Sequence, residues 1–358
     1  MRDSMIKRID LALQGGGAHG AFTWGVLDRI LGDGRLEIDG ISGTSAGAMN
    51  AVVLADGYAR GGGPDGARKA LQTFWKRVSE ASRFSPIQRT WLDRVLGRWS
   101  LDTAPGYLLF GMMTKVFSPY EFNPLDLNPL RNLIEQLVDF GRVRNCSPLK
   151  LFVSATNVRT GKARVFRRHE LSVDAVMASA CLPQLYQAVE IDGEAYWDGG
   201  YMGNPVLFPL IDETAAHDLI VVQINPVRRE RLPRTAPEIM NRLNEITFNG
   251  SLIREISSIL LLKQLIDEER VDRVRYTDMR LHRISAEREL QGLSVSSKLN
   301  AEWAFLQHLH DIGYRCADEW LERHFDRIGV DSTLDPREMH FTEAGAATHG
   351  PAVRRHRK

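Results

Sequence analysis

Two short segments near the start of the chain contain residues that could catalyse acyl transfer from an ester. The first, GTSAG at 43–47, fits the pattern G-x-S-x-G. Its flanking residues Gly43 and Gly47 permit a sharp turn from a strand into a helix, which projects the central serine hydroxyl into solvent at the carboxyl edge of a sheet. Ser45 is therefore the predicted nucleophile. The pattern is short enough to arise by chance, so its meaning depends on the surrounding sequence.

The second segment, GGGAHG at 15–20, places three consecutive glycines before a predicted helix. Backbone N–H groups in such a turn can converge on an anion, with the helix dipole behind them. If the anion is the tetrahedral intermediate formed at Ser45, then Gly15, Gly16 and Gly17 form the oxyanion hole. A side chain at Gly16 or Gly17 would then block the approach of these amides, and we expect Gly16→Val to abolish turnover.

The same glycines also fit G-x-G-x-x-G, the fingerprint of dinucleotide-binding proteins, in which the bound anion is a pyrophosphate. That fingerprint requires an acidic residue at the carboxyl end of the second strand. In this chain the second predicted strand runs directly into the serine motif, and Glu37 and Asp39 lie at its beginning. A dinucleotide-dependent oxidoreductase is therefore the weaker alternative.

A carboxylate that could act as the base follows much later in the chain. Asp198 precedes Gly199 and Gly200, two residues whose backbone can pack closely against another loop. A free Asp has a pKa near 3.9 and is a weak base for a serine hydroxyl, so it becomes useful only in a dry pocket with a close hydrogen bond. The alternative is a structural aspartate in a turn.

A Ser-His-Asp triad fits the sequence less well. Ser45, Asp198 and His217 stand in the chain order of α/β-hydrolases, but His217 immediately precedes an apolar strand. It would therefore lie at the amino end of that strand, whereas the sites of such sheets lie at the carboxyl ends. His19 is next to the glycine loop and could face the site or only pack there. The sequence contains no HExxH or other metal-ligand spacing, so we expect neither a metal nor a cofactor.

The elements that must position these motifs follow an α/β pattern. Short apolar runs predict buried strands, a hairpin of two further strands precedes Asp198, and stretches with helical spacing lie between them. Such an alternation indicates a mostly parallel sheet covered by helices. The predicted strands are 9–13, 38–41, 149–155, 188–191, 194–197, 219–224 and 279–284.

The helical predictions divide the rest of the chain into an insertion, an extension and a tail. Helices are expected at 21–31, 48–58, 171–180, 205–214, 236–248, 251–275 and 298–325. Residues 61–140 read as a helical insertion, which could form a lid or wall. Residues 227–330 read as a mainly helical C-terminal extension, and 331–358 as a largely disordered tail.

Composition excludes several functional classes. The 358 residues carry 46 basic and 45 acidic side chains, and this balance argues against a nucleic-acid binder. Three distant cysteines without a CxxC pair favour reduced thiols over disulfides or a zinc cluster. The N-terminus lacks the apolar stretch of a signal peptide, and no uncharged run approaches the length of a membrane span. We therefore expect a cytoplasmic protein.

The motifs resemble, in order, those of the patatin-like phospholipase family. The resemblance covers about residues 8–226. The matching segments are QGGGAHG at 14–20, GTSAG at 43–47, TN at 156–157 with TG at 160–161, ASACLP at 178–183 and DGG at 198–200. Many members of the family carry Arg or Lys where this chain has His19, so the loop of this chain lacks a fixed positive charge at that position.

The resemblance implies a three-layer α/β/α fold and the hydrolysis of lipid acyl esters by a Ser-Asp dyad without histidine. Ser45 would be the nucleophile, Asp198 the general base, and Gly15 to Gly17 the oxyanion hole. No cofactor would be needed. The catalytic domain would span 1–226, and the substrate would be a lipid or another acyl ester. A non-lipid carboxylesterase or intracellular polyester depolymerase is an alternative, as is a membrane-associated protein with a disused site.

A lipid esterase must take its substrate from an interface, so peripheral membrane contact is plausible. Two stretches could provide it: 107–113, within the insertion, and 252–266, which is rich in Ile and Leu. Core packing is the competing interpretation for each, and the favoured one for the second. The sequence gives no oligomeric state.

Overall fold

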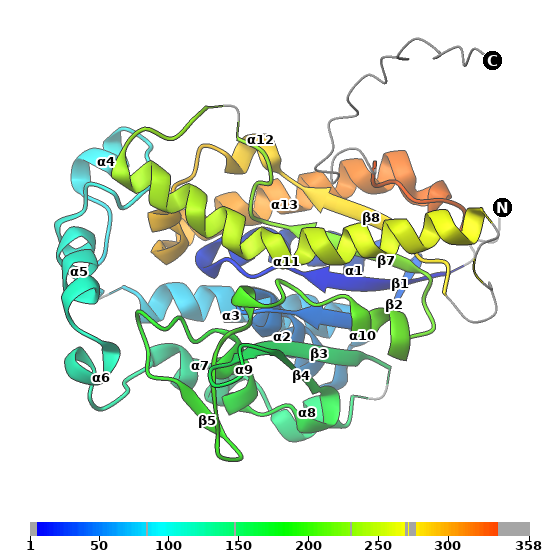
Figure 1. Ribbon diagram of the computed structural model, residues 1–358, viewed down its shortest axis with the longest axis horizontal. Helices are drawn as coiled ribbons and strands as arrows, with labels where there is room; N and C mark the ends of the chain where they lie inside the picture. Colours follow the sequence, from blue (N-terminus) through cyan, green and yellow to red (C-terminus); the bar gives the residue numbers. More distant parts are fainter. Residues whose placement is uncertain are drawn as a thin grey trace, which may run out of the picture.

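An eight-stranded, mostly parallel sheet forms the centre of the protein (Figure 1). The computed structural model describes residues 6–83, 85–146, 148–229, 231–268, 271 and 277–335. Strands β3, β2, β1, β7 and β8 lie side by side in this order and are parallel, whereas β4 and β6 are antiparallel to β3, and β5 pairs with β6. The strands are β1 (Lys7–Leu13), β2 (Leu36–Gly43), β3 (Lys150–Asn157), β4 (Ala163–Arg167), β5 (Val189–Ile191), β6 (Glu194–Asp198), β7 (Asp218–Gln223) and β8 (Arg280–Ser285).

Side chains of the central strands alternate between two hydrophobic cores, one on each face of the sheet. In β1, Leu11 and Leu13 point into one core, while Ala12 points into the other. In β7, Val222 and Val221 alternate in the same way. Because successive residues of a strand face opposite sides, an almost uninterrupted apolar run can fill both cores at once. The apolar runs predict a mostly parallel sheet covered by helices, and the family resemblance implies three layers; the structure confirms both.

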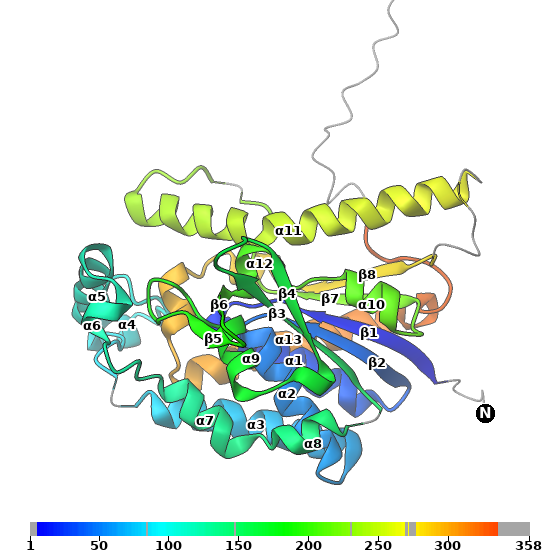
Figure 2. The ribbon, with the colours of Figure 1, turned by 60° about the horizontal axis from the view of Figure 1, so that its bottom comes forward.

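Helices cover both faces (Figure 2). The α-helices are α1 (Gly20–Asp33), α2 (Ala46–Ala59), α3 (Gly63–Ala81), α4 (Trp91–Val95), α5 (Pro105–Val116), α6 (Pro119–Phe122), α7 (Pro129–Leu137), α8 (Phe140–Arg144), α9 (Val173–Ser179), α10 (Phe208–Glu213), α11 (Ala236–Asp267), α12 (Glu287–Leu290) and α13 (Trp303–His324). Short 3₁₀ turns include η1 (Gly17–His19), η3 (Gly199–Tyr201) and η4 (Val295–Leu299). No helix in the described ranges carries an apolar stretch long enough to cross a bilayer.

All seven predicted strands are present within one or two residues of their expected bounds. Strand β4 was not predicted, because ARVFR is short and two of its five residues are arginines. Two helices were expected, at 236–248 and 251–275, where the structure has the single helix α11; residues 269–270 and 272–275 of the second prediction lie outside the described residues. Gly250 looked like a break, but a glycine costs a helix only about 1 kcal/mol relative to alanine. The apolar residues after Gly250 repay that cost by packing on the sheet.

The segment expected to be a C-terminal extension completes the central α/β fold. Strand β8 continues the sheet beside β7, and α13 packs so closely on α1 that Gly25 lies against the His310 carbonyl and Gly313 against the Phe22 carbonyl. Part of the expected tail is ordered as well, since the N–H groups of Thr333 and Leu334 both donate to the Leu281 carbonyl at 3.0 Å. Residues 336–358 lie outside the described part of the chain.

The insertion at 61–140 divides into a packed part and an exposed part. Helix α3 belongs to the core layer, where Leu71, Phe74 and Trp75 are buried. Helices α4, α5 and α6 lie at one end of the molecule, on the left in Figures 1 and 2. Helix α5 has no buried residue at all, so only this second part fits the expected lid or wall.

Candidate active site

Pairing with β3 brings the two predicted catalytic residues to the same place. Strand β4 occupies one edge of β3, pairing with its residues 152–156. Along the other edge, β2 pairs as far as Val153, opposite Gly43, and β6 then pairs with Ala155, opposite Asp198. Strand β6 therefore meets the carboxyl end of β2 head-on. Ser45, two residues after Gly43, and Asp198 come from segments far apart in sequence and face each other there.

Ser45 occupies the sharp turn that its motif predicts. Its φ of 53° lies in the left-handed region that non-glycine residues rarely adopt, and it directly precedes α2. Its N–H donates to Ser179 Oγ at 2.9 Å, which fixes the turn from the end of α9. Steric contacts explain why glycines flank the serine. A Cβ on Gly47 would collide with the Leu13 carbonyl, and one on Gly43 would lie 2.6 Å from the Gly47 carbonyl oxygen.

Asp198 is a buried carboxylate with one engaged and one unengaged oxygen. Its Oδ1 accepts the Gly200 N–H at 2.7 Å, while its Oδ2 is buried without a hydrogen-bond partner. Its own N–H donates to the Cys181 carbonyl at 2.7 Å. Burial raises the pKa of Asp198 to about 7, against the lowering influence of Gly200, the nearby Ser45 hydroxyl and the positive charge of Lys298. Oδ2 is thus available to accept a proton, on a base whose pKa is near neutral.

The Asp198-Gly199-Gly200 turn packs where a side chain could not fit. A Cβ on Gly199 would collide with the Ser154 carbonyl of β3, and one on Gly200 with the ring of Phe248 in α11. Both glycines are buried in η3. The turn is therefore held between the sheet and α11, and this explains why paired glycines follow the carboxylate.

The glycine loop between β1 and α1 offers two unused amides. The Gly15 N–H donates to Asn204 Oδ1 at 2.6 Å, so it is not free for a ligand. Among the hydrogen bonds of the described residues, none uses the N–H of Gly16 or Gly17. Gly17 has a φ of +59°, and a Cβ there would lie 2.5 Å from the Lys298 carbonyl oxygen. Of the three predicted oxyanion donors, two remain available.

Neither of the two histidines considered for a triad is placed as a base. His19 is buried and its Nε2 lies 2.8 Å from Ser297 Oγ. Burial, with the nearby charge of Lys298, lowers the pKa of His19 to about 3, so its ring is neutral and serves packing. His217 is exposed and precedes β7 at its amino end, opposite to Ser45. The prediction that it lies at the wrong end of the sheet is confirmed.

A set of amides that the sequence analysis did not assign holds the glycine loop. Gln14 Oε1 accepts the N–H groups of Ile224 and Asn225 at 2.8 and 2.7 Å, and Gln14 Nε2 donates to Asn249 Oδ1 at 2.8 Å. Asn225 Nδ2 donates to the Gly15 carbonyl at 3.0 Å. These bonds tie the loop to the end of β7 and to α11. The N–H and the carbonyl of Gly15 are therefore both held by hydrogen bonds within the protein.

Lys298, from η4, supplies a positive charge beside the glycine loop, where the loop's own sequence has none. Its Nζ donates to Asn225 Oδ1 at 2.6 Å, and its side chain lines a small pocket together with His19, Asn225 and Arg229. Burial lowers the pKa of Lys298 to about 8, while the charges of Glu245 and Asp198 raise it. The ammonium group is thus part of the electrostatic environment of Asp198.

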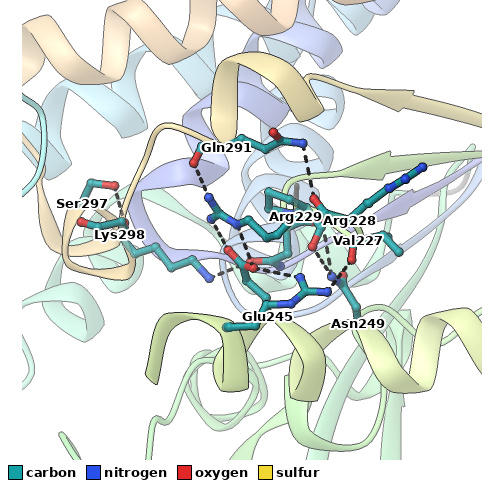
Figure 3. A network of polar contacts seen from close by, with 12 residues as sticks. Val227, Arg228, Arg229, Glu245, Asn249, Gln291, Ser297 and Lys298 are labelled. Carbon is teal, nitrogen blue, oxygen red and sulfur yellow. Dashed lines mark hydrogen bonds and ion pairs between the residues drawn. The ribbon is translucent and has the colours of Figure 1, made fainter. Parts of the chain in front are cut away.

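A partly buried ion-pair network continues from this lysine into α11 (Figure 3). Arg229 pairs with Glu245 and donates to the Gln291 carbonyl. Arg242 donates to Glu245 at 3.1 Å and to the Val227 carbonyl at 2.8 Å. The network joins the segment after β7, α11 and the region before η4. The C-terminal third of the chain therefore supports the glycine loop, through Asn249 and Lys298.

Gln14 belongs to the glycine-loop motif at 14–20, and one other supporting residue carried a signal in the sequence. Asn225 directly follows a predicted strand, and polar residues at carboxyl ends of parallel strands are candidates for a site. Asn204 directly precedes one predicted helix and Lys298 begins another, but neither belongs to a site motif, and their roles arise from contacts with residues 189 and 73 positions away. Among the described residues, no group of three or more His, Cys, Asp or Glu side chains could hold a metal ion.

Comparison with known proteins gives a family. Residues 11–211, more than half of the chain, match the family model of patatin-like phospholipase. No curated protein matches the sequence. Among solved structures, VipD from Legionella pneumophila has 16% identity and a TM-score of 0.42, over 89% of this chain and 67% of that one. Full-length ExoU, solved with SpcU from the type III secretion system of Pseudomonas aeruginosa, has 14% identity and a TM-score of 0.33, over 89% of this chain and about half of its own length, 53%. On the match over residues 11–211, this chain belongs to the patatin-like phospholipase family of lipid-ester hydrolases.

Proposed function

We propose that this protein is a serine lipid acyl hydrolase, of the phospholipase A or lysophospholipase type, which uses Ser45 and Asp198 as a catalytic dyad. The observation that carries the proposal is the unpartnered Oδ2 of a buried Asp198 at the Ser45 turn, next to the unused amides of Gly16 and Gly17. A nucleophile, a base and donors for an oxyanion are the three parts that acyl transfer requires.

The proposed reaction has two halves. Ser45 Oγ attacks the ester carbonyl while its proton passes to Asp198 Oδ2, and the Gly16 and Gly17 amides stabilise the oxyanion. The tetrahedral intermediate then expels the alcohol, which takes the proton from Asp198. In the second half, a water molecule loses its proton to Asp198 and attacks the acyl-enzyme, and Ser45 recovers a proton when the fatty acid leaves. An Asp198 pKa of about 7 suits both directions of proton transfer.

Labelling with a fluorophosphonate serine probe tests this proposal most directly. We expect labelling at Ser45, located by peptide mass spectrometry, and weaker labelling in Asp198→Asn. A parallel panel of phospholipids, lysophospholipids and short-chain or polymeric esters distinguishes a lipid hydrolase from a general carboxylesterase or polyester depolymerase. Folded protein that is not labelled would favour the disused-site alternative or, if it binds NAD(P), the oxidoreductase, and would contradict the dyad.

Activity and stability should respond to pH in opposite directions. The base must be ionised to act, so kcat should rise with pH through about 7. The folded pKa of Asp198 lies above its unfolded value of 3.8, so between about pH 4 and 7 the native state binds more protons than the unfolded state. The stability that the neutral carboxyl provides is therefore lost as pH rises through this window.

Asp198→Asn should consequently raise Tm at pH 8 relative to the unmodified protein, and have a smaller effect at pH 5. Asp10 offers a matched control, since burial also raises its pKa to about 7. It lies inside β1, three residues before the end of the strand, and has no proposed part in catalysis. We expect Asp10→Asn to show the same pH-dependent Tm difference with unchanged kcat. Thermal unfolding and ester hydrolysis of the three proteins check this; equal loss of activity in both variants would contradict the assignment of the base.

Lys298 is proposed as a positioning residue for Asp198 and the glycine loop. Its positive charge lowers the pKa of Asp198, so Lys298→Met should move the pH midpoint of kcat to higher pH. A rise of about one pKa unit would lower kcat at pH 7 about fivefold, because the ionised fraction of Asp198 would fall from about one half to about one tenth. Lys298→Arg keeps the charge and should restore the midpoint. A purely structural role would lower kcat without moving the midpoint, so the pH profiles of the two variants decide between the roles.

The site of action proposed for the enzyme is the cytoplasm, in contact with lipid. Cys146, Cys181 and Cys316 are free thiols, and free thiols are typical of reducing compartments. Burial raises the pKa of Cys181 to about 12, so this thiol next to the Asp198 strand is unreactive and does not compete with Ser45 as a nucleophile.

A further inference from the structure

Large hydrophobic side chains are exposed on this protein in an uneven way. Of the 25 that are exposed in the described residues, thirteen lie between 91 and 127 and five more between 232 and 246. Trp91 is 75% exposed, Leu109 61% and Leu125 78%. Single exposed hydrophobic residues are ordinary, but a concentrated group marks an interaction site. We call residues 91–127 and 232–246 together the apolar end.

The apolar end gathers at one extremity of the molecule. In Figures 1 and 2, α4, α5, α6 and the first turns of α11 lie at the left, and β1 runs toward them from the right, where the N-terminus is marked. The parallel strands have their carboxyl ends on this side, and Ser45 follows the carboxyl end of β2. The apolar end therefore lies on the catalytic side of the sheet.

Hydrogen bonds join the apolar end to residues that support the site. The Leu101 N–H donates to Ser296 Oγ at 2.8 Å, in the same short turn as Lys298. Gln187 Nε2 donates to the Asn123 carbonyl at 2.9 Å, and the Gln187 carbonyl accepts from the Cys181 thiol at 3.0 Å. Cys181 in turn accepts the Asp198 N–H. The surface is thus attached at two points to segments that border the dyad.

The charge on the apolar end favours an anionic partner. Among its described residues and the described neighbouring residues 228, 229 and 231, more basic than acidic side chains are exposed. Two of the acidic side chains, Glu121 and Glu238, are engaged at helix N-termini. The exposed basic residues are Arg94, Arg98, Lys115, Arg228, Arg231 and Arg234, and the exposed acidic residues are Glu121, Asp126 and Glu238.

Exposed apolar side chains bordered by arginines and lysines are the composition of surfaces that lie in the interface of anionic membranes. We propose that the apolar end docks on an anionic phospholipid bilayer and holds the Ser45 side of the sheet against the lipid. This proposal rests on the proposed function, because it names the surface through which the hydrolase reaches its substrate. The other stretch considered from the sequence, 252–266, does not qualify: Leu252, Ile253, Ile256, Ile259 and Leu260 are buried in the core.

Vesicle flotation tests the docking surface separately from catalysis. We would use the Ser45→Ala protein, so that lipid is not consumed, with vesicles of phosphatidylcholine alone or mixed with phosphatidylglycerol. We expect binding to the mixed vesicles, at least about tenfold weaker binding to phosphatidylcholine alone, and weakening by salt. In the Leu109→Asp/Met112→Asp and Leu243→Asp variants, binding to the mixed vesicles should fall at least about tenfold, because charges would enter the interface.

Leu261→Asp is the matched control. Leu261 is 57% exposed, similar to Leu109, but lies in the other half of α11, so its replacement should leave binding unchanged. The proposal would be overturned if Leu261→Asp lost as much vesicle binding as the other variants, if those variants lost none, or if Ser45→Ala did not bind the mixed vesicles. So would a dimer that dissociates in Leu109→Asp/Met112→Asp, since the surface would then be a protein interface. When Ser45 is present, the same variants should hydrolyse a soluble short-chain ester at the rate of the unmodified protein. If the unmodified protein does not hydrolyse that ester, the result counts against the dyad and not against the docking surface.

Discussion

Asp198→Asn is expected to lower kcat by about 10⁴-fold while the protein stays folded. An effect of this size follows when the carboxylate of a catalytic serine site is replaced by an amide, and here the carboxylate itself is the proposed base. The amide keeps the shape of the side chain and can still accept the Gly200 N–H through Oδ1. It cannot take the Ser45 proton, so only the chemical step is removed. Steady-state kinetics on a soluble ester, with circular dichroism for the fold, measure this.

Ser45→Ala should be at least as inactive, and the double variant no worse than either single variant, because residues that act as one unit give non-additive losses. His19→Ala and His217→Ala are the variants to compare. If Asp198→Asn kept most of its activity while one of the histidine variants lost it, a histidine would be the base. The neutral ring of His19 and the remote position of His217 predict the opposite result.

Gly17→Val should lower kcat by about 10²- to 10³-fold, the loss expected for one donor of an oxyanion hole. Gly17 has a φ of +59°, and an added Cβ would lie 2.5 Å from the Lys298 carbonyl. The loop must therefore shift, and the Gly16 and Gly17 amides lose their common target. KM for a soluble ester should change much less than kcat, because these amides act on the oxyanion and not on the ground-state carbonyl.

Gly34→Val is the control for Gly17→Val. Gly34 has a φ of +75°, and a Cβ there would contact nothing within 4 Å, so the substitution adds backbone strain away from the site. It should lower Tm and leave kcat unchanged. A Gly17→Val protein with the kinetics of Gly34→Val would contradict the loop assignment. Gly16→Val separates the effects further, since a Cβ at Gly16 meets only ordinary contacts at 3.4 Å or more and would act by shielding its own amide.

The sequence was most informative where function depends on a short segment at the end of a strand. The serine turn and the glycine loop are local: small residues between an apolar run and a helix can form few other structures. The hairpin before Asp198 was predicted in the same way. What the sequence did not indicate was that β6 would meet β2 end to end along one edge of β3, because strand pairing is not encoded in any of the three strands alone.

Helix boundaries and supporting side chains were harder to predict. The break expected near Gly250 was wrong because burial of the following residues on the sheet outweighs the local preference of glycine. The position of the glycine loop beside Ser45 was predicted, but the hydrogen bond from the Gly15 amide to Asn204 was not. Such contacts depend on which loops the fold places together.

By itself, the sequence of this protein determined the α/β class, seven of the eight strands in the described residues, the two candidate catalytic motifs and the end of the sheet on which they lie. Periodicity and turn chemistry act over a few residues, and this range is enough for those features. The tertiary structure alone decided that Asp198 is dry enough for a pKa of about 7, and that Lys298 replaces a missing charge beside the loop. It also decided that no residue of 107–113 is buried, while most apolar residues of 252–266 are. Burial and electrostatic neighbourhood are properties of the packed whole, because each depends on groups that are distant in the chain and adjacent only after folding.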